Sequence, residues 1–142
     1  MTSEPTLFSR ARAEIVDLHH FFFEWYRTVS AEKTHFGRFE SVIGDGFRMI
    51  PPSGKILDRD AVLDYVRNNR ATCGSDFLIS TDDIRGGWES DDTIIVSYIE
   101  IQHRGGKHSR RQASAVFTTR SSAPNGVEWR HLHETWLQMP EG

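Results

Sequence analysis

The first quarter of the chain carries apolar residues at the spacing of one face of a helix. They follow one another three or four positions apart: Ala11, Ile15, Leu18, Phe22, Trp25 and Val29. A stripe of this period predicts an amphipathic helix from about Ser9 to Thr28, with the stripe facing the core. The next stretch, THFGRFESVIGDG, predicts a short second helix that ends at Gly44 or Gly46.

Residues 47–69 predict a hairpin followed by a third helix. The stretch FRMIPPSGKILD indicates two short extended segments around a Pro-Ser-Gly turn. Asp58 then precedes RDAVLDYVRNN, where it is placed to cap a helix. In that helix we expect Val62, Tyr65 and Val66 to face inward.

The second half of the chain has the composition of strands. Four segments rich in β-branched and aromatic residues span 76–86, 92–104, 109–120 and 127–138. Glycine pairs and an Asn-Gly pair lie between them and predict turns, so neighbouring strands are expected to pair antiparallel. Helices first and strands after predict an α+β fold, with three N-terminal helices packed on a curved antiparallel sheet.

The strand TIIVSYIEIQH carries apolar residues on both of its faces. In a sheet with one solvated face, apolar and polar residues would alternate along the strand. One face carries Ile95, Ser97, Ile99 and Ile101, and the other carries Ile94, Val96, Tyr98, Glu100 and Gln102. We expect one face to meet the helices. Because no further helix remains to cover the other face, we expect it to meet a second subunit, which predicts a homodimer through the sheet.

Composition narrows the class of protein. The chain has 142 residues, which fits a single domain over 1–142, and a net charge of −3, which favours neither nucleic acid nor a membrane surface as partner. Cys73 is the single cysteine, so no internal disulfide forms. The N-terminus lacks the pattern of a signal peptide and the apolar runs are short, so we expect a soluble cytoplasmic protein.

Two stretches carry a resemblance to a known superfamily. GDGFRMIPPSGKILDRDAVLDYV and the ending WRHLHETW, together with the order of the elements, resemble the NTF2-like superfamily and within it the SnoaL-like and DUF4440 group. The ending is also similar to the association domain of calcium/calmodulin-dependent kinase II, in which a Trp precedes a strand with two His. Here His133 matches the first, and Thr135 replaces the second.

The resemblance implies a cone-shaped barrel whose cavity lies between the long helix and the sheet. In the last strand Trp129, His131, His133 and Thr135 alternate with Arg130, Leu132, Glu134 and Trp136. Guided by the association domain, we expect the first set to face the cavity beside Ala113, Ala115 and Phe117, with Tyr98, Glu100 and Gln102 on the adjoining strand. A slip by one residue would invert this set.

Within that cavity, Glu100 with His131 or His133 is the candidate acid/base pair, and Tyr26 is a candidate hydrogen-bond donor from the first helix. A buried pair that only satisfies its own polar groups is the alternative. A zinc site on His131 and His133, with Glu100 or His103 as third ligand, is a further alternative that no spacing requires. We therefore expect no metal and no cofactor.

The leading hypothesis is a protein that binds a small, mostly apolar molecule. If it is an enzyme, it is a cofactor-independent isomerase, cyclase or dehydratase that works by proton transfer. The alternative is a non-catalytic binding or association module, because a fold of this kind hosts many functions.

Overall fold

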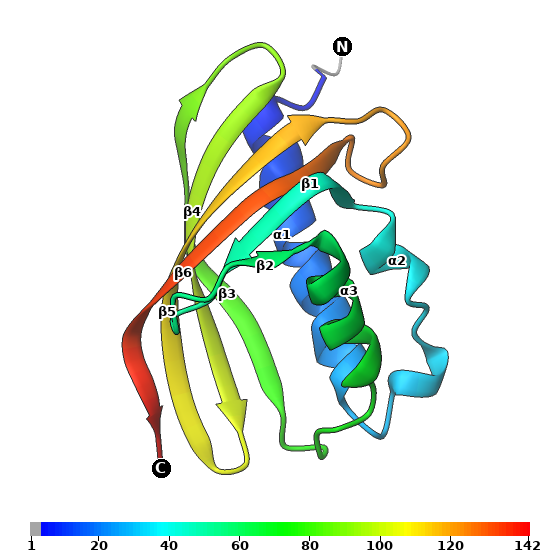
Figure 1. Ribbon diagram of the computed structural model, residues 1–142, viewed down its shortest axis with the longest axis vertical. Helices are drawn as coiled ribbons and strands as arrows, with labels where there is room; N and C mark the ends of the chain where they lie inside the picture. Colours follow the sequence, from blue (N-terminus) through cyan, green and yellow to red (C-terminus); the bar gives the residue numbers. More distant parts are fainter. Residues whose placement is uncertain (1–3) are drawn as a thin grey trace.

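The computed structural model describes residues 4–142, and its elements are shown in Figure 1. In chain order they are α1 (Leu7–Tyr26), η1 (Ala31–Lys33), α2 (Gly37–Glu40), β1 (Ile43–Ile50), β2 (Leu57–Asp58), α3 (Arg59–Asn68), β3 (Leu78–Glu89), β4 (Thr93–Arg104), β5 (Lys107–Thr119) and β6 (Val127–Glu141).

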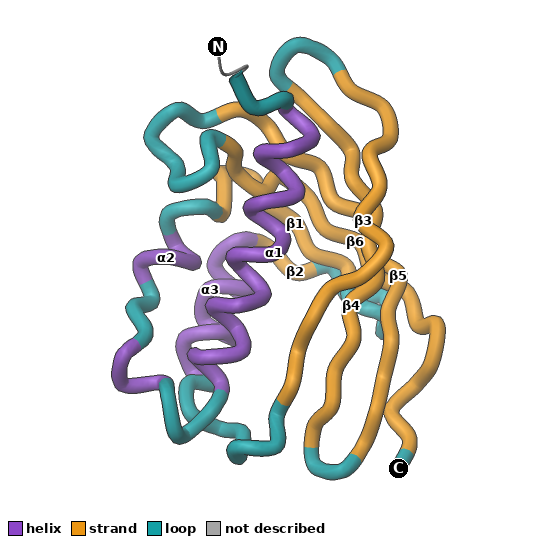
Figure 2. The backbone as a smooth tube through the Cα atoms, turned by 180° about the vertical axis from the view of Figure 1, so that it is seen from behind, coloured by secondary structure: helices purple, strands orange, loops and turns teal. Residues whose placement is uncertain are grey.

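All six strands form one curved sheet in the order β2-β1-β6-β5-β4-β3. Every neighbouring pair is antiparallel except β1 and β6, which run parallel. The helices cover one face of this sheet, and α1 runs along its concave side (Figures 1 and 2). The predicted α+β fold is thus confirmed. The sheet does not close into the expected barrel, since β2 and β3 remain its two edges in the described chain.

Helix α1 follows the predicted stripe. Its cap is Thr6, whose side-chain oxygen accepts a hydrogen bond from the Ser9 amide at 3.0 Å. Four members of the stripe are buried: Ala11, Ile15, Leu18 and Trp25. The helix ends at Tyr26, so Val29 lies beyond it and is exposed. Neither this helix nor any other in residues 4–142 is long and apolar enough to cross a membrane.

The predicted second helix is only one turn long, and its proposed end was wrong. Helix α2 ends at Glu40, and both Gly44 and Gly46 lie in β1. Gly44 passes so close to β6 that an added Cβ would lie 3.1 Å from the Trp129 carbonyl oxygen, and Gly46 has a φ of +74°. These glycines therefore serve an irregular strand and not a helix end.

Helix α3 agrees with the sequence at its start. The Asp58 carboxylate accepts a hydrogen bond from the Ala61 amide at 2.9 Å, which caps the helix as predicted. Val62 and Val66 are buried, whereas Tyr65 is 57% exposed, contrary to the expectation that it faces inward.

A β-bulge at Arg130 decides which side chains of β6 face the helices. Phe117 of β5 pairs with Trp129, but the preceding residue Val116 pairs with His131, which leaves Arg130 as an extra residue. Alternation therefore restarts one position later. Trp129 faces the core as predicted, but the expected position of His131 and His133 was wrong: they lie on the outer face of the sheet, and Leu132 and Glu134 face inward.

The outer face of the sheet carries a row of isoleucines on β4. Ile95 is 37% exposed, and Ile99 and Ile101 are half-buried. No helix of residues 4–142 lies over this face (Figures 1 and 2). The sequence pattern predicted apolar residues on both faces of this strand, and this row forms its outer face.

Candidate functional site

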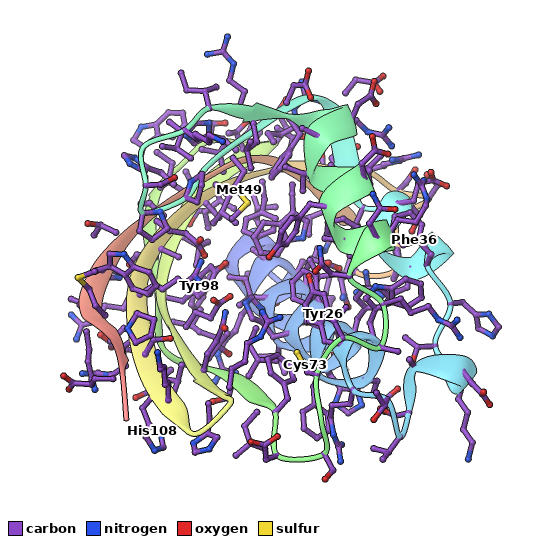
Figure 3. All side chains as sticks on the ribbon, turned by 60° about the horizontal axis from the view of Figure 1, so that its bottom comes forward. Tyr26, Phe36, Met49, Cys73, Tyr98 and His108 are labelled. Atoms are coloured by element: carbon purple, nitrogen blue, oxygen red, sulfur yellow. The ribbon has the colours of Figure 1, made fainter. Side chains whose placement is uncertain are left out.

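A cavity of about 450 Å³ lies between α1, α3 and the concave face of the sheet. Its wall is mostly apolar and includes Phe22, Phe47, Met49, Phe77, Trp129 and Leu132. Figure 3 shows Tyr26, Met49 and Tyr98 around this interior. The lining residues Ser53, Tyr65 and Arg104 are exposed, so the cavity reaches solvent at the end of the sheet where they lie. This size is within the range of small-molecule sites.

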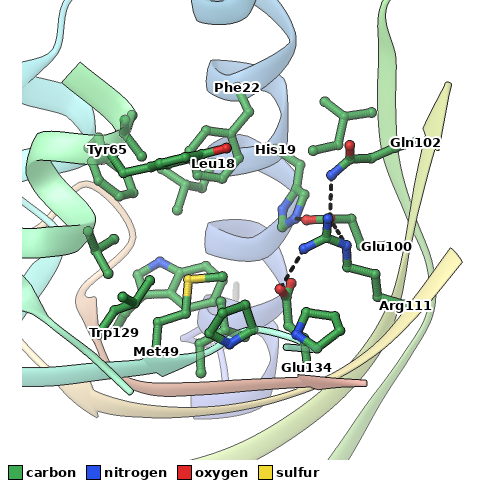
Figure 4. A pocket seen from close by; sticks show the side chains of 18 of the residues that line it. Leu18, His19, Phe22, Met49, Tyr65, Glu100, Gln102, Arg111, Trp129 and Glu134 are labelled. Carbon is green, nitrogen blue, oxygen red and sulfur yellow. Dashed lines mark hydrogen bonds and ion pairs between the residues drawn. The ribbon is translucent and has the colours of Figure 1, made fainter. Parts of the chain in front are cut away.

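A cluster of buried polar side chains occupies one wall of the cavity (Figure 4). Glu100 of β4 is its centre. One carboxylate oxygen lies 2.9 Å from Nε2 of His19 on α1, and the other accepts a hydrogen bond from the Gln102 amide at 2.8 Å. His19 and Glu100 are 3% and 6% exposed, so this contact is almost free of water.

Arg111 of β5 joins Glu100 to a second carboxyl group on β6. Its Nη1 donates to Glu134 Oε1 at 2.9 Å, and its Nε lies 3.6 Å from Glu100 Oε2. The guanidinium also lies over the Trp136 ring, 4.8 Å from the centroid. The four charged groups thus form a continuous cluster drawn from α1, β4, β5 and β6: His19, Glu100, Arg111 and Glu134.

The proton on the His19 ring can be placed from its contacts. Nδ1 lies 2.8 Å from the Ile15 carbonyl oxygen, which can only accept, so Nδ1 carries a hydrogen. The contact between Nε2 and Glu100 then needs one more proton between them. Burial acts to lower the pKa of His19, but the hydrogen bond and negative charge of Glu100 outweigh it and raise that pKa. Burial likewise acts to raise the pKa of Glu100, and the bond to His19 and the charges of His19 and Arg111 lower it. The pair is therefore an imidazolium and a carboxylate.

Glu134 is the acid of the cluster whose pKa lies near neutral pH. Burial raises the pKa of its carboxyl to about 7, and the negative charge of Glu100 adds to the increase, while Arg111 opposes it. Among residues 4–142, only its Oε1 has a hydrogen-bond partner, so Oε2 is left for a bound molecule. A group of this pKa can give or take a proton near pH 7.

Tyr98 and Glu134 flank a small residue on the same wall. Across the sheet, Tyr98 pairs with Ala113, and Ala113 pairs with Glu134. Ala113 itself is fully buried, whereas Tyr98 and Glu134 both line the cavity. The Tyr98 hydroxyl is buried and has no hydrogen-bond partner among the described residues. Burial also raises the pKa of this phenol well above its usual value, so it remains a donor.

The structure separates the residues proposed from sequence. Glu100 and Tyr26 line the cavity, and Tyr26 packs between Phe22 and Phe77. His131 is half-buried and His133 is exposed. Both lie on the outer face of the sheet and not in the cavity, where they were expected to act. Burial, with the positive charges of His133 and Arg48, lowers the pKa of His131. Residues 4–142 bring no three His, Cys, Asp or Glu side chains together in the arrangement of a metal site.

Sequence reasoning missed three members of the cluster. His19 follows Leu18 and lies four residues after Ile15, so it was a polar residue on the apolar face of α1, and that was a usable signal. Arg111 and Glu134 gave no such signal, because their position depends on strand pairing and on the bulge.

Another buried acid near the cavity has a structural role. Glu14 of α1 is fully buried, and its carboxylate accepts hydrogen bonds from Arg38 at 2.8 Å, Trp129 at 3.1 Å and Asn125 at 3.2 Å. Its oxygens are satisfied by protein donors, so Glu14 ties α1 to α2, to β6 and to the loop before β6.

A family model described as sucrose-6-phosphate phosphohydrolase C-terminal matches residues 11–138. No curated protein sequence matches the chain. An NTF-2 like protein of unknown function from Pseudomonas aeruginosa is 24% identical, with a TM-score of 0.78 over 89% of this chain and 98% of the other.

Two further solved structures share the fold. A hexachlorocyclohexane dehydrochlorinase of type 2 is 14% identical, with a TM-score of 0.63 over 96% of this chain and 90% of that one. A putative Ca/calmodulin-dependent kinase II association domain from Exiguobacterium sibiricum is 16% identical, with a TM-score of 0.65 over 96% and 98%. The fold is therefore NTF2-like, and its neighbours include an enzyme and an association domain. The finer SnoaL-like and DUF4440 grouping stays a prediction, because the family model that matches is a different one.

Proposed function

The chain belongs to the sucrose-6-phosphate phosphohydrolase C-terminal family, and from that starting point we propose that it binds a small, mostly apolar molecule in its cavity and transfers a proton to it without a cofactor. The observation that carries this proposal is Glu134. It is a buried carboxyl with a pKa of about 7 and a free oxygen, at one wall of a 450 Å³ apolar cavity.

The other polar groups have supporting roles in this proposal. The positive charge of Arg111 holds Glu134 in place through the 2.9 Å hydrogen bond, and the His19–Glu100 ion pair holds Arg111. In its neutral form Glu134 donates a proton to an oxygen of the bound molecule, and the carboxylate that remains takes a proton from a neighbouring carbon, so Glu134 ends protonated again and an isomerisation, a cyclisation or a dehydration can follow. Tyr26, which also lines the cavity, remains a proposed donor to the same molecule.

A thermal-shift screen of small ketones, alcohols and acids, followed by NMR of each ligand in D₂O, tests this function. The natural protein should exchange a ligand hydrogen for deuterium or convert the ligand, and Glu134→Gln should bind it without reaction. His133→Gln, on the outer face, is the matched control and should react like the natural protein. Ligands that bind without any exchange or conversion in the natural protein would exclude the catalytic part of the proposal.

The outer face of the sheet favours a second function, association with another copy of the chain. Ile95, Ile99 and Ile101 form an apolar row on β4, interrupted by Ser97, in which Ile95 is exposed and the other two are half-buried. We propose a homodimer in which this row packs against its counterpart around a two-fold axis.

Sedimentation velocity at micromolar concentration tests the homodimer. The natural protein should sediment as a dimer, and Ile99→Lys should sediment as a monomer, because it buries a charge in the contact. Val29→Lys replaces an apolar residue that is 62% exposed and lies beyond α1, and it should leave the dimer intact. A monomeric natural protein would exclude this role of the outer face.

A further inference from the structure

The charges of the cavity cluster depend on one proton. His19 and Glu100 together carry no net charge, because the imidazolium and the carboxylate cancel. Arg111 contributes one positive charge. With Glu134 ionised the cluster is neutral, and with Glu134 protonated it carries one uncompensated positive charge inside an apolar cavity. Burial of a net charge is unfavourable unless a partner of opposite sign is present.

Two hydrogen-bond donors of the cluster have no acceptor among residues 4–142. The Tyr98 hydroxyl and the Arg111 Nε are both buried and have no acceptor within hydrogen-bond distance among residues 4–142. Both Glu100 oxygens are used, by His19 and Gln102, and Glu134 Oε1 receives a bond from Arg111, so among residues 4–142 Glu134 Oε2 is the carboxylate oxygen of the cluster without a partner. A protonated Glu134 Oε2 would be a third free donor. Buried donors without acceptors are costly, so the wall is suited to a group that brings acceptor oxygens.

The geometry points to one class of ligand. We propose that the cavity binds a monocarboxylate with an apolar body, that its carboxylate lies between Tyr98, Arg111 and Glu134, and that one proton is bound with it. The apolar body then lies against Phe22, Met49 and Phe77 toward the open end. This inference rests on the proposed function, because it concerns the ligand of the same cavity.

The proton has one place to bind within this arrangement. Glu134 is faced by His19 from α1, by Tyr98 and Glu100 from β4 and by Arg111 from β5, while β1 and the loop after it contribute the uncharged Met49 and Pro51. Of these groups, Arg111 stays charged and Tyr98 stays neutral. His19 and Glu100 each stabilise the charged form of the other, so Glu134 is the group that takes up the proton. A ligand carboxylate beside an ionised Glu134 would be repelled, so the anion and the proton bind together.

Calorimetric titration with 4-phenylbutyrate and with its amide tests the inference. The dissociation constant of the carboxylate should rise about tenfold between pH 6 and pH 8, since one proton with a pKa of about 7 accompanies it. The amide, which is neutral and nearly the same shape, should bind more weakly at pH 6 and show no dependence on pH. In Glu134→Gln the carboxylate should bind equally well at both pH values.

Tyr98→Phe tests whether the Tyr98 hydroxyl contacts the ligand or stabilises the fold. Because the hydroxyl has no partner among residues 4–142, its removal should not lower the stability of the unliganded chain, yet it should weaken the binding of 4-phenylbutyrate about tenfold. His133→Gln is the control and should bind like the natural protein. Failure of 4-phenylbutyrate to bind at pH 6, equal binding of the amide, or an unchanged pH dependence in Glu134→Gln would each overturn the carboxylate site.

The two proposals for the cavity fail in different ways. If 4-phenylbutyrate binds with its proton but no ligand of the screen exchanges hydrogen, the carboxylate site stands and catalysis is refuted. If neutral ligands react and the carboxylate does not bind, the proton transfer stands and the carboxylate site is refuted.

Discussion

Replacing Glu134 with Gln is expected to make the folded protein more stable at alkaline pH, because it removes a buried carboxyl that resists ionisation. Folding raises the pKa of Glu134 from an ordinary value of 4.5 to about 7. Between these values the unfolded chain has released the proton and the folded chain still holds it. The unfolded state therefore binds fewer protons, and the free energy of unfolding falls as the pH rises.

The size of the effect follows from the two pKa values. One pKa unit corresponds to about 1.4 kcal/mol. With both states weighted by their ionised fractions, the contribution of Glu134 to the free energy of unfolding falls by about 2.5 kcal/mol between pH 5 and pH 8. Gln is nearly isosteric with the protonated acid and does not titrate. The stability of Glu134→Gln relative to the natural chain should thus increase by this amount over that range.

Urea unfolding followed by tryptophan fluorescence at pH 5, 6.5 and 8, at one fixed protein concentration, measures this difference. Glu89→Gln removes an exposed carboxyl at the end of β3 and controls for the loss of one acidic group. A stability difference between Glu134→Gln and the natural chain that is the same at all three pH values would refute the reasoning. It would mean that Glu134 is ionised in the folded protein as readily as in the unfolded chain.

Three further changes test other parts of the structure, each by the same unfolding measurement and the last also by the titration with 4-phenylbutyrate. Glu14→Leu should lower the free energy of unfolding by about 3–5 kcal/mol, because it leaves the guanidinium of Arg38 without its carboxylate, and wild-type stability would mean that this network is dispensable. Asp58→Ala should cost about 1 kcal/mol through loss of the α3 cap, and no loss would show that the cap bond does not contribute. The double change of His131 and His133 to Gln should lower the free energy of unfolding by less than about 0.5 kcal/mol and leave ligand binding intact, since both lie outside the cavity. Loss of binding would show that these histidines belong to the site.

The parts of the fold that depend on local pattern were predictable. The apolar stripe from Ala11 to Trp25 predicted α1, and the composition of the last four segments predicted β3 to β6, because side-chain period follows directly from backbone geometry. The second helix was less predictable, because Gly44 and Gly46 resemble a helix stop and instead allow an irregular strand to pass close to Trp129.

The candidate site was predictable only in part, because its members come from distant segments. Glu100 was recognised as a carboxyl on the inner face of β4, but its partner His19 lies 81 positions away in the sequence and on another element. The neutral-pH acid Glu134 was placed on the outer face, because plain alternation from Trp129 omits the extra residue at Arg130. A bulge is fixed by neighbouring strands, so the sequence of β6 alone does not reveal it.

The bulge at Arg130 also affects how residues are matched between this chain and its relatives. In a relative whose last strand has no bulge, positions two and four residues after the tryptophan face the cavity. An ungapped alignment would pair those positions with His131 and His133, which face outward here. A single gap placed at Arg130 instead matches them to Leu132 and Glu134. Functional residues transferred across this family by alignment are thus correct only if the gap is placed by structure, and a well-aligned histidine can be the wrong one.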